Sequence, residues 1–161
     1  MNIQIVTREA RTLAYIRVIG PYETALPSGF DQLCRWAEQQ GKMDGEWYAL
    51  YWDNPELTAP EALTTDVAIT VAEDYPGDEQ VAIQTLPAGR YACYSCRIED
   101  DDFATPWIQF FKQWLPQSGE ALGEGACFEQ YLNDGHKDGY ASGEEVCADK
   151  EVTLLVGSIE P

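Results

Sequence analysis

The chain has 161 residues, close to the length of one domain, and 45% of them are hydrophobic, with 5 Trp, 9 Tyr and 5 Phe. This supply of large apolar side chains argues against an intrinsically disordered chain. The 10 Lys and Arg against 28 Asp and Glu give a net charge of −18, so we expect phosphate backbones to be repelled and nucleic acid not to be bound directly. A cationic ligand, or a basic protein that itself binds DNA, would be attracted by this charge, although solubility alone also accounts for it.

The N-terminus has no basic segment followed by an apolar one, and no apolar run reaches the roughly 18–20 residues of a membrane helix. We therefore expect a cytoplasmic protein without membrane contact and with reduced thiols, since its 5 Cys are an odd set. Cys93 and Cys96 have C-x-x-C spacing, but they fall on a predicted strand, which puts the two sulfurs on opposite faces. With His136 as the one histidine, the sequence predicts neither a metal site nor a cofactor.

The first half of the chain predicts a strand, a helix and two further strands. These elements are a strand over Arg11–Ile19, a helix from the Gly20-Pro21 turn to near Gly41, and strands over Trp47–Trp52 and Asp66–Val71. The helix carries apolar residues at the i, i+3, i+4, i+7 spacing of one buried face, namely Phe30, Leu33, Cys34 and Ala37. The segment Ala72–Glu79 is interpreted as the joint between the halves.

The second half predicts the same order of elements. They are a strand over Gly89–Tyr94, a helix capped by Thr105 with Pro106 at its first position and stopped by Pro116, and strands over Phe128–Asp134 and Glu151–Val156. The helix repeats the buried-face spacing with Trp107, Phe110, Phe111 and Trp114. The middle strand matches Tyr48–Asn54 at an offset of 80 residues. The apolar stretches Ile3–Val6 and Val81–Thr85 are interpreted as extensions of the two opening strands.

This duplication predicts an α+β fold in which two strand–helix–strand–strand units form one antiparallel sheet with two helices on one face. We expect a single domain over residues 1–161, with pseudo-repeats of about 1–73 and 79–161 and an approximate twofold axis between them. The two helices should leave a central groove over the middle strands, which is a common place for a ligand pocket.

Glu129 breaks the symmetry of the repeats, because the equivalent residue of the first half is Ala49. Strand alternation puts Glu129 on the same face as Tyr131. If the helices cover that face, the carboxylate lies among Trp107, Tyr131 and Tyr51, where an unpaired charge is costly. Such an aromatic cage with one acid suits an aromatic or cationic small molecule. The alternative is that Glu129 lies on the solvent face as one of the 28 acids.

Three groups of motifs carry a family resemblance over nearly the whole chain: Tyr51-Trp52-Asp53-Asn54-Pro55, Asp102-Phe103-Ala104 with Pro106-Trp107, and Cys127-Phe128-Glu129 with Tyr131–Gly135. Together they resemble the DNA gyrase inhibitor family, the SbmC/GyrI group within the wider GyrI-like superfamily. The resemblance implies a protein that binds DNA gyrase, restrains supercoiling and protects cells from gyrase-directed toxins. We expect it to be a monomer.

The same resemblance implies a ligand site. In the superfamily, the glutamate matching Glu129 contacts cationic or aromatic ligands and the tryptophan matching Trp107 helps to wall the cleft, so the predicted ligand-binding residues are Glu129, Trp107, Tyr131 and Tyr51. Some relatives hydrolyse strained cyclopropane compounds with the same pair. Three hypotheses therefore stay open: gyrase inhibition, sequestration of a small molecule, and hydrolysis with Glu129 as general base. No other catalytic residue is assigned.

Overall fold

The computed structural model describes residues 3–99, 102, 104–121, 126–131 and 149–156. Within these residues the strands are β1 (Ile3–Arg8), β2 (Arg11–Ile19), β3 (Trp47–Tyr51), β4 (Thr64–Thr70), β5 (Ala82–Leu86), β6 (Gly89–Glu99), β7 (Cys127–Tyr131) and β8 (Asp149–Val156). The helical elements there are α1 (Tyr22–Gln40), the 3-10 turn η1 (Pro60–Ala62), α2 (Ala104–Gln109), the π-helical turn η2 (Phe110–Trp114) and α3 (Leu115–Ser118). The predicted strand end at 132–134, the turn with His136, and Cys147 lie outside the described residues.

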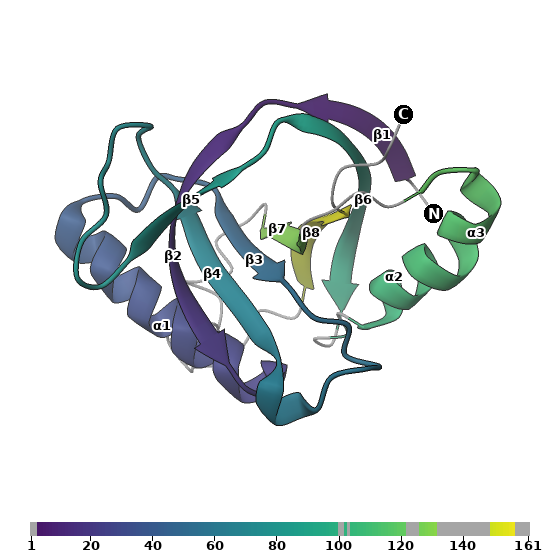
Figure 1. Ribbon diagram of the computed structural model, residues 1–161, viewed down its shortest axis with the longest axis horizontal. Helices are drawn as coiled ribbons and strands as arrows, with labels where there is room; N and C mark the ends of the chain where they lie inside the picture. The colour runs from purple at the N-terminus through teal and green to yellow at the C-terminus, as the bar shows by residue number, and fades with distance from the viewer. Residues whose placement is uncertain (1–2, 100–101, 103, 122–125, 132–148, 157–161) are drawn as a thin grey trace.

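The strands form one antiparallel sheet in the order β1-β6-β8-β7-β3-β4-β2-β5. In Figure 1, α1 appears at the left of the view and α2 with α3 at the right. The predicted α+β class and the duplicated strand–helix–strand–strand unit are confirmed. The middle strands β3 and β7 pair with each other, so the two repeats meet at the centre of the sheet.

The first helix follows its sequence pattern closely. The four residues predicted for its buried face are all buried, and the helix ends at Gly41, whose φ of 65° is the left-handed conformation that glycine adopts at little cost. Within the helix, Gly29 approaches the sheet so closely that a Cβ there would come within 2.9 Å of Val18 and 3.1 Å of Val67. The missing side chain is what lets α1 approach β2 and β4.

The ends of the second helical segment differ from the prediction. The helix begins at Ala104, and Asp102 rather than Thr105 provides the cap: its carboxylate accepts the Thr105 N–H at 3.1 Å and the Thr105 hydroxyl at 2.6 Å. A carboxylate is the stronger acceptor beside the positive end of a helix. Pro116 does not stop the segment, because α3 restarts at Leu115 after the π-helical turn and Pro116 falls in its first turn, where no N–H is required.

The interpretation of Ile3–Val6 and Val81–Thr85 as extensions of the opening strands is wrong. They form separate strands, and each crosses to the other repeat: β1 pairs with β6, and β5 pairs with β2. Pro87 separates β5 from β6, since proline cannot donate a hydrogen bond to a sheet. This exchange of strands places β5 beside β2 and β1 beside β6. Without it, β2 and β6 would each have an unpaired edge.

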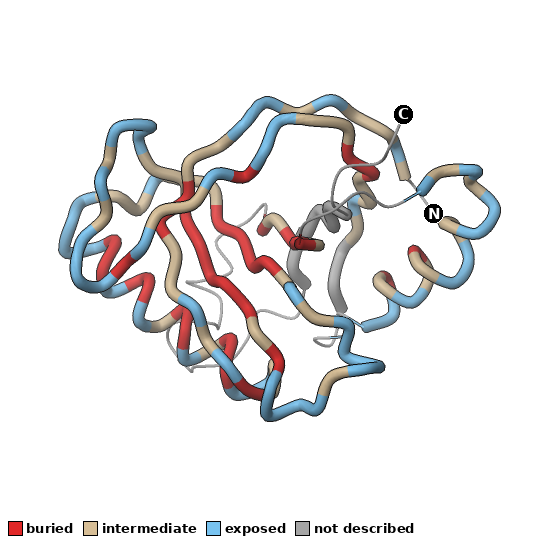
Figure 2. The backbone as a smooth tube through the Cα atoms, viewed as in Figure 1, coloured by how far each residue is buried: buried red, intermediate tan, exposed pale blue. Residues whose placement is uncertain are grey.

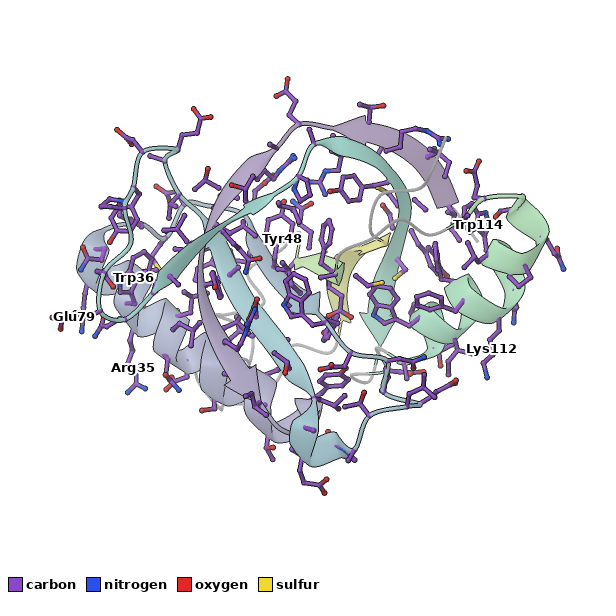
Figure 3. All side chains as sticks on the ribbon, in the orientation of Figure 1. Arg35, Trp36, Tyr48, Glu79, Lys112 and Trp114 are labelled. Carbon is purple, nitrogen blue, oxygen red and sulfur yellow. The ribbon has the colours of Figure 1, made fainter. Side chains whose placement is uncertain are left out.

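The sheet has two differently packed faces. Both helices cover one face: α1 packs on residues such as Ala49 and Val67, and Phe110 of the second segment packs on Ala92. The other face curves around a second core that includes Tyr48 and Phe128, and Tyr48 is seen inside the curve in Figure 3. Figure 2 shows the buried residues following the central strands.

A polar cluster that joins the two repeats borders the second core. Arg8 of β1 donates to the Tyr48 hydroxyl and to Gln130 of β7, both at 3.1 Å. Glu46 accepts hydrogen bonds from Arg11 at 2.7 Å and from the Tyr48 hydroxyl at 2.8 Å. Burial has the largest single effect on the pKa of Glu46 and raises it, but these partners together hold the pKa below its usual value.

None of the helices in the described part of the chain has the length and hydropathy of a membrane-spanning segment.

The close approach at Gly29 predicts the effect of one added methyl group. Gly29→Ala should lower the free energy of unfolding by about 1–2 kcal/mol, because overpacking against Val18 and Val67 outweighs the gain in helix propensity. Urea unfolding measures this, with Ser28→Ala at the exposed neighbouring position as control. A Gly29→Ala protein as stable as the parent would contradict the proposed contact.

Candidate functional site

The centre of the sheet places Glu129 on the approximate twofold axis. Residues of β3 and β7 are equivalent at the offset of 80, and in the antiparallel pairing Ala49 lies directly opposite Glu129. This is the one position at which two equivalent residues are paired with each other. The side chain of Glu129 points to the helix-covered face, where Ala49 leaves room for it. The interpretation of Glu129 as one of the solvent-exposed acids is therefore wrong, since it is only 1% exposed.

Three aromatic residues donate hydrogen bonds to this carboxylate. The hydroxyls of Tyr51 and Tyr131 donate to Oε1 at 2.6 Å and 2.8 Å, and the indole N–H of Trp107 donates to Oε2 at 2.8 Å. The structure thus brings together all four residues that the sequence predicts as ligand-binding. They come from three elements, since Tyr51 ends β3, Trp107 lies in α2, and Tyr131 shares β7 with the glutamate.

Further rings surround these donors. Tyr22 lies edge-on to Tyr51 with ring centroids 5.2 Å apart, and Phe30 lies edge-on to Tyr131 at 5.5 Å. On the other side, Phe111 stacks on Trp107 at 5.9 Å. The sequence interpretation missed Tyr22, although it precedes Leu26 and Phe30 at intervals of four residues along the buried face of α1.

The pKa values of neighbouring groups reflect the buried, acidic surroundings of the cage, the group formed by Glu129, Tyr51, Trp107 and Tyr131. Burial raises the pKa of Tyr22 to about 12, with smaller contributions from Asp53 and Glu129. Burial also raises the pKa of the Cys96 thiol to about 11, again with a contribution from Glu129. Cys93 and Cys96 point to opposite faces of β6, as predicted, because Cys93 packs in the second core and Cys96 against the helix-covered one. Two protonated thiols on opposite faces do not form a redox pair.

Asp66 is a second buried acid in the described part of the chain. It is fully buried, and Arg17 binds it with two parallel hydrogen bonds at 2.8 Å and 2.9 Å. That arrangement compensates a buried charge with an opposite one. Within the part of the chain that the structure describes, no three His, Cys, Asp or Glu side chains lie close enough to hold a metal ion.

The cage is closed in this structure. Because the carboxylate is 1% exposed, the rings fill the predicted groove at this point. Among its donors, Trp107 is partly exposed and lies in α2, which leads directly into the π-helical turn η2. Such turns interrupt regular helical hydrogen bonding and often occur at functional sites.

Comparison with known proteins identifies the family to which the sequence is related. The sequence profile described as "GyrI-like small molecule binding domain" matches residues 1–147. The chain is 44% identical over 144 residues to a protein of Yersinia enterocolitica named DNA gyrase inhibitor, with 87% of this chain and 92% of that protein covered. It is 43% identical to a protein of the same name from Serratia proteamaculans, with the same coverage. These matches confirm the resemblance that the motifs carry.

A solved structure confirms the fold independently of sequence. The crystal structure of the EcmrR C-terminal domain superposes with a TM-score of 0.69 at 14% sequence identity, covering 99% of this chain and 97% of that one.

The hydrogen bonds to Glu129 predict which tyrosine hydroxyls stabilise the protein. Tyr131→Phe should lower the free energy of unfolding by about 1.5–3 kcal/mol, because a buried carboxylate loses one of its donors. Tyr75→Phe is the control, since it removes a hydroxyl that donates to the carboxylate of Asp78 at an exposed position and should therefore lower the stability less. Equal losses in urea unfolding would show that the Tyr131 hydroxyl contributes no more than a surface contact.

Proposed function

We propose that this chain, which belongs to the GyrI-like small-molecule-binding domain family, is an inhibitor of DNA gyrase. The observation that carries the proposal is the 44% identity, over 87% of the chain, to a relative named DNA gyrase inhibitor. On this proposal the protein acts in the cytoplasm, binds gyrase directly, restrains its supercoiling activity and reduces the damage done by gyrase-directed toxins.

The charge of the protein supplies a physical basis for this activity. An enzyme that holds DNA presents Lys and Arg side chains along its DNA path, and a protein of net charge −18 is attracted to the same surface. The protein would then compete with DNA for this surface of the enzyme and would not bind DNA itself. Attraction of this kind speeds association and is screened by salt, because the Debye length falls to about 8 Å at physiological ionic strength.

The gyrase proposal predicts inhibition that depends on salt. Purified protein should reduce DNA supercoiling by purified gyrase at low ionic strength, and the half-inhibitory concentration should rise severalfold as salt is increased. An unrelated acidic protein of similar size and net charge is the control, because it separates specific binding from charge alone. Unchanged supercoiling at saturating protein in low salt would contradict the proposal.

We also propose that the cage around Glu129 binds a small aromatic cation. This candidate is supported by a buried carboxylate whose three aromatic donors come from β3, α2 and β7, and by the family to which the chain belongs, whose description is small-molecule binding. Since these donors already engage both oxygens, the arrangement favours binding over the hydrolytic alternative, in which the carboxylate would have to accept a proton from water.

Ligand binding can be followed by tryptophan fluorescence, to which Trp107 contributes. Tetraphenylphosphonium, a lipophilic aromatic cation, should change the tryptophan emission on titration, and Glu129→Gln should weaken its binding roughly tenfold to 150-fold, the equivalent of about 1.5–3 kcal/mol for a lost charged contact. Glu79→Gln, at an exposed position, controls for the change in net charge. The same dissociation constant for Glu129→Gln and for the parent protein would exclude the carboxylate as the recognition group.

A further inference from the structure

Exposed hydrophobic side chains occur where β2 and β3 end and in the loop between β3 and β4. Among the described residues, Ile19, Trp52, Leu57 and Ile108 are the large hydrophobic residues that are exposed, with 66%, 44%, 84% and 52% of their surfaces accessible. Ile19 ends β2 and pairs with Thr64, whose carbonyl accepts the backbone N–H of Trp52 at 3.4 Å. Leu57 follows in the loop between β3 and β4, which forms the lower edge of the molecule in Figure 1. We call the surface formed by Ile19, Trp52 and Leu57 the Trp52 edge.

Trp52 is held in place although it is exposed. Its indole N–H donates to Oδ2 of Asp66 at 2.8 Å. Asp66 is itself fully buried and fixed by Arg17 and by Gln84, which donates to it at 2.9 Å. The Arg17 guanidinium also lies 5.8 Å from the centre of the Trp52 ring, within the range of a cation–π contact. A large ring with 44% of its surface in water is thus fixed in one orientation by a buried acid and an arginine.

A fixed, exposed tryptophan is costly for folding alone but favourable for binding. Its apolar surface remains in water, whereas its side-chain entropy has already been lost, so a partner that covers it does not have to order it. Tryptophan and arginine are also the residue types that most often dominate the energy of protein interfaces. The geometry of the Trp52 edge is therefore that of a preorganised protein-binding anchor.

The charge around the anchor indicates what kind of partner fits. The segment from 52 to 63 contains Asp53, Glu56 and Glu61 and no Lys or Arg. The charge of neighbouring Arg17 is matched by buried Asp66. Lys112 approaches Glu56 at 3.5 Å, but both side chains are well exposed, so the pair contributes little. The edge thus presents apolar groups with an acidic rim.

We infer that the Trp52 edge is the surface that docks onto a basic protein, one with an apolar pocket for Trp52 and Leu57 bordered by Lys or Arg side chains. The inference rests on the proposed function, and the partner on that proposal is gyrase, a DNA-binding enzyme with basic surfaces. The acidic rim disfavours DNA itself and also a second copy of this chain, since like charges would face each other. The docking surface is separate from the Glu129 cage, which lies on the other face of the sheet.

Binding of gyrase to immobilised protein, measured together with supercoiling, tests this assignment. Leu57→Ser should weaken gyrase binding at least tenfold without affecting the fold, because Leu57 is 84% exposed. Glu61→Lys should weaken binding and flatten its salt dependence, whereas Glu79→Lys, an identical charge reversal at an exposed site outside the edge, should change affinity less than twofold. Trp52→Ala should have the largest effect, and circular dichroism checks that each variant is folded.

The outcomes separate the two proposals. If the parent protein binds gyrase and Leu57→Ser and Glu61→Lys bind it equally well, the edge is not the docking surface, although the proposed function stands. If the parent protein does not bind gyrase at low salt, the proposed function fails and this inference fails with it. If Leu57→Ser changes only the sedimentation of the chain alone, the edge is a self-association surface and the inference is overturned.

Discussion

A carboxylate on a twofold axis imposes a constraint on the whole molecule. Glu129 faces Ala49 at the centre of the sheet, and its buried charge has to be satisfied by hydrogen bonds. One donor, Tyr51, comes from the first repeat, and two, Trp107 and Tyr131, come from the second. The cage is therefore complete only when both repeats and the second helical segment are packed together, so folding and the formation of the site are one event.

The two buried acids organise different surroundings on opposite faces of one sheet. Glu129 gathers aromatic donors on the helix-covered face, where we propose the small-molecule site. Asp66 gathers Arg17 and Trp52 on the other face, where a ring is left exposed. Tyr51 is the last residue of β3 and Trp52 follows it directly, so the alternation of an extended chain directs these neighbouring side chains to opposite faces.

Local patterns predicted the parts of the fold that depend on local periodicity. The bounds of β2, the buried face of α1 and the shared face of Glu129 and Tyr131 all follow from spacing within a few residues. Spacing left open which face of the sheet that is. The exchange of β1 and β5 could not be predicted in this way, because an apolar strand carries no mark of the strand with which it pairs. The burial of Asp66 was missed for a similar reason, since Arg17 and Gln84 reach it from two other strands.

The exchange of β1 and β5 also sets an order on synthesis. Ile3 of β1 pairs with Tyr94 of β6, so β1 waits unpaired until synthesis has reached β6. Contacts between such distant positions slow folding, since the long intervening segment has to be ordered first. The nascent N-terminal repeat carries an unfinished sheet throughout this interval, and it is the arrival of the second repeat that removes its open edges.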